Sequence, residues 1–394
     1  MENMTMSTEW VTRVTNTTTD STDMDDGLIS VTVTDQNIFF FVYSTVDTLL
    51  VTWIMPLIFA IGVIGNFSVI IVFFRVRSMQ TVTNHYLVNL AVADLTFLIF
   101  AVPQFWMQYA TSPIINDYTH IGKLYCPAVL FFADVSIIVS CTTVILLTLE
   151  RYIAICIPHK FKQLSTRPRA LMLCGMIWCL SAAYKAVELG LARTVKKRMI
   201  WPDDPYYASF PEFAHFCEYC DMRKQYCLIF RYTLLVDQFL ILIVIPVTMV
   251  MYTLIVMQLQ RLSKTTTSSR GSSSSSTRMK TQVVRMLIVT ITVYVICITP
   301  FRMLNIFDIF HYFNNIALDS LWVMVNTARI MMYCNSAVNP VIYNIMSDRY
   351  RLAFRETFLC CLPALPTMNH INEVSTARKT KYTTPSMKYS EAAR

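Results

Sequence analysis

The sequence predicts an all-α membrane protein in which seven helices cross the bilayer and a short eighth helix lies at its surface. Two observations carry this prediction. The 394 residues are 55% hydrophobic and only 15% charged, which is too apolar for a soluble protein of this length. The apolar residues also gather in seven stretches, each near or above the roughly 20 residues that a helix needs to cross the hydrocarbon core.

The seven stretches are joined by polar loops of unequal charge. The loops after the first, third and fifth stretch are rich in Lys and Arg, and such loops stay in the cytoplasm. The net charge of +8 therefore does not indicate nucleic-acid binding. Seven spans place the N-terminus outside the cell in a multi-pass protein of the plasma membrane. The expected spans are Thr48–Phe74, Tyr86–Ile115, Leu124–Ile155, Ala170–Leu191, Leu228–Leu259, Met286–Phe310 and Leu318–Met346.

Four regions follow from this pattern. Residues 1–47 are acidic and rich in Thr, so we expect a disordered extracellular segment without a cleavable signal peptide. Asn3 and Asn16 are glycosylation acceptors there, although such short motifs also arise by chance. Residues 48–346 form the seven-helix bundle, residues 347–361 form the eighth helix, and residues 362–394 form a disordered cytoplasmic tail.

The eighth helix is predicted from its spacing. Tyr350, Phe354 and Phe358 recur every fourth residue with arginines between them, which is typical of an interfacial helix beside anionic membrane lipids. Cys360 and Cys361 then fit palmitoylation sites, with unmodified cysteines as the alternative.

Charged residues inside membrane spans are costly, so each one marks a candidate site. The alternative is an internal ion pair that only holds two helices together, and for Asp237 the two alternatives stand equal. No nucleophile–base pair or metal-ligand cluster stands out, so we expect no enzyme. The charged residues considered are Asp94, Asp134, Glu150, Arg151, Asp237, Arg302 and Arg329.

Short motifs occur in a fixed order along the spans. They are Gly65-Asn66, Leu90–Asp94, Cys126, Glu150–Tyr152, Trp178, Pro246, Pro300 and Asn339–Tyr343. From Leu49 to Cys361 this ordered set resembles the rhodopsin-like class of G-protein-coupled receptors. The runs TNHYLVNLAVADL and RIMMYCNSAVNPVIYNIMSDRYRLAF look most like the thyrotropin-releasing-hormone and ecdysis-triggering-hormone receptors.

The resemblance implies two inner sites. One is a polar core that holds an allosteric sodium ion, because carboxylate and hydroxyl oxygens suit a hard cation; a water-filled network without an ion is the alternative. Its residues are Asp94, Ser140, Asn335, Ser336 and Asn339. The other is the switch that meets a heterotrimeric G protein, in which Arg151 pairs with Glu150 at rest. Its residues are Glu150, Arg151, Tyr152 and Tyr343.

In the outer half the resemblance implies an extracellular peptide ligand. Arg302 and Arg329 fall where the thyrotropin-releasing-hormone receptor has arginines that contact its amidated tripeptide, and a guanidinium suits carbonyl oxygens. Asp134 is the nearest counter-charge, and Phe301 and Tyr109 would supply an apolar wall. The alternative is that the two arginines form structural salt bridges to Asp134 or Asp308.

By the same resemblance Cys126 pairs with a cysteine of the second extracellular loop, a compartment that permits disulfides. The loop offers Cys217, Cys220 and Cys227. The family spacing to Pro246 favours Cys220, with Cys217 as the alternative.

The function implied is a receptor for a short, C-terminally amidated neuropeptide that signals through calcium-mobilising heterotrimeric G proteins. Ile298 stands where the family has a tryptophan that repacks on activation, so a ligand-independent or orphan receptor with an altered switch is the alternative. A seven-span transporter is a third class, which the ordered motifs disfavour. The hydroxyl-rich loop Leu262–Thr277 and the tail are expected to be phosphorylated and to bind arrestin. The sequence does not name the peptide.

Overall fold

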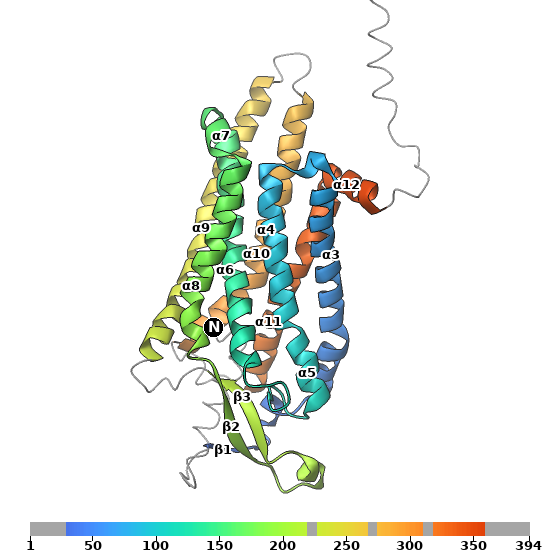
Figure 1. Cartoon of the computed structure of the whole chain (residues 1–394), viewed down its shortest axis with the longest axis vertical. Helices are drawn as coiled ribbons and strands as arrows, with labels where there is room; N and C mark the ends of the chain where they lie inside the picture. Colours follow the sequence, from blue (N-terminus) through green and yellow to red (C-terminus); the bar gives the residue numbers. More distant parts are fainter. Residues whose placement is uncertain (1–28, 219–226, 267–273, 310–317, 359–394) are drawn as a thin grey trace, which may run out of the picture. The chain divides into compact units, whose positions relative to one another are not determined.

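The computed structural model describes residues 29–218, 227–266, 274–309 and 318–358. Long helices run alongside one another, with a small β-sheet at one end and the short helices α7 (Pro158–Leu164) and α12 (Asp348–Phe358) at the other (Figure 1). Several residues with expected roles lie outside the described residues, namely Asn3, Asn16, Cys220, Cys360 and Cys361.

The helices follow the predicted spans in order. The first span runs through α2 (Thr45–Leu49), the π-helix η2 (Leu50–Ile54) and α3 (Met55–Arg75). A short 3-10 helix, η3 (Arg77–Met79), leads into the second span. The other long helices are α4 (Val82–Ala101), α5 (Pro103–Thr111), α6 (Tyr125–Cys156), α8 (Arg167–Leu189), α9 (Cys227–Thr266), α10 (Ser274–Ile309) and α11 (Leu318–Met346).

Six of the described helical segments are long and apolar enough to cross a membrane. Helix α11 has 29 residues and is long enough as well, but Arg329, Asn335, Ser336 and Asn339 make it more polar. These four side chains are buried, and membrane helices tolerate polar groups that face other helices. Because α11 packs against α10 and α3, it completes the predicted seven-helix bundle.

A close approach fixes α3 against α11. A Cβ atom at Gly65 would lie 3.0 Å from the ring of Pro340, so a larger residue would push the two helices apart. The next residue along the chain is Asn66, whose Nδ2 donates to the backbone oxygen of Ser336 at 2.8 Å, about one turn before Pro340. This bond holds α11 in the position that places its polar residues inside the bundle.

The second span differs from the expected single helix. It breaks between α4 and α5 at Val102, and Pro103 occupies the first turn of α5. Proline has no N–H to continue the ladder of α4, but it is well suited to start a helix. The break redirects α5, which carries Phe105, Gln108 and Tyr109.

The sheet consists of β1 (Ile29–Thr32), β2 (Arg193–Ile200) and β3 (Phe213–Glu218) in the order β1-β2-β3. Strand β1 runs parallel to β2, and β3 runs antiparallel to it. The two short helices η1 (Ile38–Phe40) and η4 (Pro205–Ser209) accompany the sheet. Val31, Phe41 and Phe216 are completely buried in one cluster, so residues 29–47 pack against the segment between α8 and α9 that carries β2 and β3.

This packing corrects the expectation that residues 1–47 are disordered, which is wrong for residues 29–47. The average composition of residues 1–47 misled the prediction, because it hides that ten of the 19 residues from Ile29 to Asp47 are apolar, Val31 and Phe41 among them. Ser44 and Asp47 also form a capping box that starts α2.

The disulfide joins Cys126 to Cys217, with 5.6 Å between the Cα atoms. The preference for Cys220 was therefore wrong, and the alternative is confirmed. Strand β3 pairs Cys217 with Thr194 of β2 and holds it at the outer end of α6. The choice of Cys220 relied on the family's usual number of residues between the bridging cysteine and Pro246. The sequence does not show whether this chain keeps that number, so the spacing could not decide between the two cysteines.

Helix α12 is confirmed as an eighth helix, with a face slightly different from the predicted one. Tyr350, Ala353 and Thr357 are buried, and Phe354 is half-buried. The buried positions therefore follow a spacing of three and four residues, which matches the 3.6-residue turn better than a strict repeat of four.

Candidate functional site

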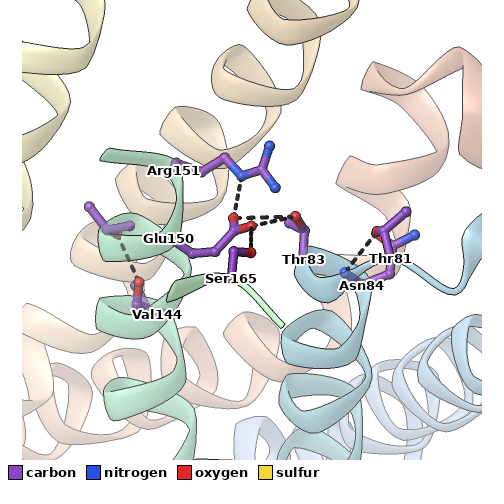
Figure 2. Close-up of polar contacts among 8 residues, drawn as sticks. Thr81, Thr83, Asn84, Val144, Glu150, Arg151 and Ser165 are labelled. Atoms are coloured by element: carbon purple, nitrogen blue, oxygen red, sulfur yellow. Dashed lines mark hydrogen bonds and ion pairs between the residues drawn. The ribbon is translucent and has the colours of Figure 1, made fainter. Parts of the chain in front are cut away.

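Near α7 and the start of α4, Glu150 collects several polar contacts (Figure 2). Its carboxylate pairs with Arg151 Nε at 2.7 Å and accepts from Ser165 Oγ at 3.2 Å. Thr83 Oγ1 lies 3.3 Å and 3.4 Å from the two carboxylate oxygens. Glu150 is buried, so one carboxylate links α6, α4 and the segment between α7 and α8.

The predicted pairing of Glu150 with Arg151 is therefore confirmed. Sequence reasoning missed Thr83, in the first turn of α4, and Ser165, between α7 and α8, because no pattern singles out either hydroxyl. Nearby, Tyr343 is buried with its ring 5.5 Å from that of Tyr350. Tyr152 is half-buried against the apolar cluster at the same end of the bundle.

The predicted inner polar residues lie together. Asn339 Nδ2 donates to Asp94 Oδ2 at 2.8 Å, and both side chains are buried. Asp94 also lines a cavity of about 10 Å³ with Ser140, Asn335 and Ser336. The oxygens of a carboxylate and two serines fit a small hard cation, and the same atoms fit one water molecule.

In the outer half of the bundle, Lys185 of α8 forms an ion pair with Asp237 of α9. The alternative of an internal ion pair is thus confirmed for Asp237. Arg302 of α10 donates to Gln238 Oε1 of α9 at 3.3 Å. Asp134 of α6 lies within electrostatic range of Lys185, Asp237 and Arg302.

Lys185 is absent from the residues that sequence reasoning singled out. It lies inside the fourth predicted span, so the rule that intramembrane charges mark sites also applied to it. Lys185 is a further buried cation near Asp134, so the charge of Asp134 is not reserved for the arginines, as the sequence had suggested.

Arg329 lies in a different environment. A cavity of about 70 Å³ lies between η2, α5 and α11, and Arg329 lines it with Asp47, Phe105 and Asn326. Its guanidinium is 5.9 Å from the Phe105 ring, and one nitrogen donates to Asn326 Oδ1 at 3.4 Å. Its Nε atom has no hydrogen-bond partner among the residues that the structure describes.

The rest of this cavity is apolar and aromatic. Tyr43, just before α2, contributes to the wall, and burial raises the pKa of its phenol well above the usual range, so the hydroxyl remains a proton donor. The ring of Tyr109 packs edge-on against that of Tyr43, with 5.0 Å between the ring centroids. Tyr109 therefore supports the cavity wall from behind Tyr43. The carboxylate of Asp47 already accepts two hydrogen bonds from Ser44, from the backbone N at 2.9 Å and from Oγ at 2.7 Å.

The expected ligand residues therefore divide into two groups. Arg302 and Asp134 lie among α6, α8, α9 and α10, whereas Arg329 faces η2 and α5. Phe301 is completely buried in the apolar core rather than on an open wall. The sequence suggested one site with two arginines, and the contacts of the described residues give two polar environments.

Comparison with known proteins supports the reading of these motifs. The family model "7 transmembrane receptor (rhodopsin family)" matches residues 65–343. Neuromedin-U receptor 2 of Mus musculus is 30% identical over 312 residues, which cover 77% of this chain and 74% of the relative. The allatostatin-A receptor of Bombyx mori is 27% identical over 79% of this chain and 81% of its own.

The thyrotropin-releasing hormone receptor of Gallus gallus is 29% identical over 81% of this chain and 80% of its own. The matched family consists of receptors and not of enzymes. The family match includes residues of all seven long helical segments, the Glu150–Arg151 pair and the polar core around Asp94. The chain therefore belongs to the rhodopsin family of seven-transmembrane receptors.

Proposed function

We propose that this chain is a plasma-membrane receptor for a short neuropeptide with an amidated C-terminus. The similar receptors named above carry the names of peptides, namely neuromedin U, allatostatin A and thyrotropin-releasing hormone. The sheet and the cavity around Arg329 lie at the end of the bundle opposite α7 and α12, and we place this end outside the cell. A peptide then meets the cavity first.

The observation that carries the proposal is the incompletely bonded guanidinium of Arg329 in an aromatic cavity. It is 9% exposed, its one hydrogen bond is long, and its Nε is without a partner among the described residues. A carbonyl oxygen satisfies such a donor, and a hydrogen bond to a charged group contributes roughly 1.5–3 kcal/mol. The uncharged carboxamide at the end of an amidated peptide supplies this oxygen, and its hydrocarbon neighbours fit Phe105 and Trp322.

We propose signalling through heterotrimeric G proteins of the calcium-mobilising class. The Glu150 cluster is a two-state element, because Arg151 is held by Glu150 here and is free to contact a G protein once Glu150 releases it. Arrestin then binds after phosphorylation of the loop Leu262–Thr277 and of the tail.

We further propose that a sodium ion binds beside Asp94 in the resting receptor. The carboxylate is 1% exposed and would otherwise carry an unbalanced buried charge. The nearby side chains of Ser140 and Ser336 offer the additional oxygens that such an ion prefers.

A screen of amidated peptides and their free-acid forms, read by cytosolic calcium in cells that express this chain, tests the proposed function. We expect an amidated peptide to activate the receptor and its free acid to be at least tenfold weaker. Equal potency of the two forms would contradict the amidated ligand. A response in cyclic AMP without calcium release would contradict the calcium-mobilising class.

Ile298 favours a second candidate, a receptor with high ligand-independent signalling. It is 4% exposed within the apolar core of the outer half, beside Tyr294 and Phe301. An isoleucine has no large flat ring to hold the resting arrangement in place. Strong signalling without peptide that no peptide increases would support this candidate instead.

A further inference from the structure

The connection between β2 and β3 forms an ordered tip on the hairpin. It runs from Trp201 to Glu212 at the end of the hairpin that lies away from the long helices (Figure 1). Asp204 begins the short helix η4 in this tip, because its Oδ1 accepts a hydrogen bond from the backbone N of Tyr206 at 2.8 Å. The carboxylate of Asp204 is therefore held directly beside Tyr206.

Two adjacent tyrosines of the tip differ in their surroundings. Tyr207 stacks on Trp201, with 5.8 Å between the ring centroids and 10° between the ring planes, and packs against Phe210 at 5.4 Å. Tyr207 is half-buried as a result. The ring of Tyr206 meets that of Tyr207 edge-on at 4.9 Å, and Tyr206 stays 63% exposed. Of the two phenols, that of Tyr206 is the accessible one.

The surroundings of Tyr206 are acidic. Asp203 and Asp204 precede it in the sequence, and both are exposed. Asp35, from the segment before η1, lies with Asp204 within electrostatic range of Tyr207. Two parts of the chain that are far apart in the sequence therefore bring carboxylates to the same tip.

The basic residues nearest to the tip have other partners. No Lys or Arg occurs between Arg198 and Arg223 in the sequence. Arg198 forms an ion pair with Glu212 at 2.8 Å. The Lys196 Nζ atom lies over the ring of Phe213, 4.1 Å from its centroid. The aspartates beside Tyr206 therefore keep their negative charge without a paired cation on β2.

An exposed phenol in an acidic turn suits one kind of covalent modification. A receptor whose sheet faces outward carries this tip through the lumen of the secretory pathway, already folded. Transferases in that lumen move a sulfonate group from an activated sulfate donor to tyrosine. Because the donor is an anion, such an enzyme has a cationic cleft, and acidic residues beside the tyrosine are attracted to that cleft.

We propose that Tyr206 is sulfated on its phenolic oxygen and that Asp203 and Asp204 guide the transferase to it. The phenolic oxygen attacks the sulfur atom of a sulfonated nucleotide, and a new O–S bond forms. The bond from sulfur to the phosphate oxygen of the donor breaks, so the nucleotide phosphate is the leaving group. The phenol proton passes to a base of the transferase, and no atom is oxidised or reduced.

Exposure selects Tyr206 among tyrosines with similar acidic neighbours. Tyr118 follows Asp117 directly, but it is 5% exposed and its hydroxyl donates to Gln104 Oε1 at 2.9 Å. Tyr207 shares the two aspartates of Tyr206 but lies within the aromatic cluster. The acidic pattern alone would favour all three tyrosines, whereas the structure favours Tyr206.

The first test uses the full-length receptor from cells that are supplied with radioactive sulfate. N-linked glycans are removed enzymatically before counting, because glycans carry sulfate themselves. We expect peptide mapping to place the label on Tyr206 in the parent receptor and in the matched control Tyr207→Phe. Tyr206→Phe should lose this label and reach the cell surface normally, because the side chain is exposed. A tip peptide without sulfate in the parent, sulfate on Tyr207 instead, or a group that phosphatase removes would overturn the proposal.

The second test removes the charges of the two aspartates. In Asp203→Asn/Asp204→Asn, the side-chain oxygen that starts η4 is kept, because Asn caps a helix about as well as Asp. We expect the label on Tyr206 to fall about tenfold or more, since attraction between opposite charges raises association rates by that order. The control Asp203→Glu keeps the charge and should keep the label. An unchanged label in the double variant would contradict guidance by the aspartates.

The proposal rests on one part of the proposed function, the placement of the sheet outside the cell. An amine reagent that does not cross membranes tests this placement on intact cells. Lys196 is exposed on β2 and should react, whereas Lys197 is 1% exposed and should not. If Lys196 reacts and Tyr206 carries no sulfate, the sulfation is contradicted and the placement stands. If Lys196 reacts only in opened cells, the placement fails and the sulfation fails with it.

Discussion

The carboxylate of Glu150, in α6, accepts a hydrogen bond at 3.2 Å from Ser165, which lies outside that helix and 15 residues further along the chain. Ser165 lies in the two-residue link between α7 and α8, so this bond connects that link to the Glu150–Arg151 pair. A structural change at Ser165 therefore acts directly on Glu150, which in turn holds Arg151.

We predict that Ser165→Ala raises signalling in the absence of ligand. The lost hydrogen bond is worth about 0.5–1.5 kcal/mol, which shifts a two-state equilibrium by roughly two- to tenfold. Ser165→Thr keeps the hydroxyl and should restore the parent level. The measurement is basal G-protein turnover at matched surface expression, with the exposed neighbour Thr166→Ala as the control. Equal basal turnover in Ser165→Ala and Thr166→Ala would refute a restraining role for Ser165.

We predict that Cys126→Ala and Cys217→Ala lower surface expression to a similar extent, because each breaks the same bond. Loss of a native disulfide costs roughly 2–5 kcal/mol. Peptide mapping of the unreduced receptor should recover Cys126 linked to Cys217. The control is Cys220→Ala, which should be expressed normally. A linked peptide that contains Cys220 would show that strand β3 is misplaced.

We predict that the N-terminal segment stabilises the receptor. Phe41 is completely buried beside Phe216, with ring centroids 6.3 Å apart, so Phe41→Ala should destabilise by about 3–5 kcal/mol. Ile29 is 47% exposed at the edge of the same sheet, and Ile29→Ala should have little effect. Unfolding temperatures of the purified variants measure the difference. Similar temperatures for both variants would mean that the segment does not pack on the sheet.

We predict that sodium stabilises the ligand-free receptor. The unfolding temperature should be higher in sodium chloride than in choline chloride at equal ionic strength, since an ion that binds only the folded state stabilises it. Asp94→Asn should abolish the difference, because it removes the charge that attracts the ion. A difference that persists in Asp94→Asn would place the ion elsewhere.

Much of the fold was predictable because a membrane-spanning helix requires a long run of apolar residues, which is visible in the sequence. The six most apolar spans were found within a few residues, and α11 was recognised from its motif although Arg329 and Asn339 lower its hydropathy. The pair Glu150–Arg151 was predicted from the family resemblance, and the structure shows the two side chains in contact. Asp94 and Asn339 were linked only through the family resemblance, since nothing local relates two residues so far apart.

The rest depends on contacts that no local pattern reveals. The pairing of β1 with β2 joins residues near 30 to residues near 198. The alternation of apolar and polar residues from Ile29 to Thr34 is typical of a strand, but it does not identify the partner strand. The choice of Cys217 follows from the register of β3 and not from spacing. The separation of Arg302 from Arg329 follows from where Gln238 and Phe105 lie, and the sequence shows only that both arginines are in outer halves.

The most direct measurement is a double-mutant cycle between Arg329 and the C-terminal amide of an activating peptide. Arg329→Lys keeps the charge but not the planar fork of donors, so the potency of the amidated peptide should fall about ten- to hundredfold. A peptide whose terminal carboxamide is replaced by a methyl group lacks the oxygen that Arg329 binds and is already weakened. Arg329→Lys should weaken this peptide little further, because both changes remove the same contact. This non-additive result is what the account predicts. Well-expressed Arg329→Lys receptors on which both peptides lose the same factor, or none, would contradict it.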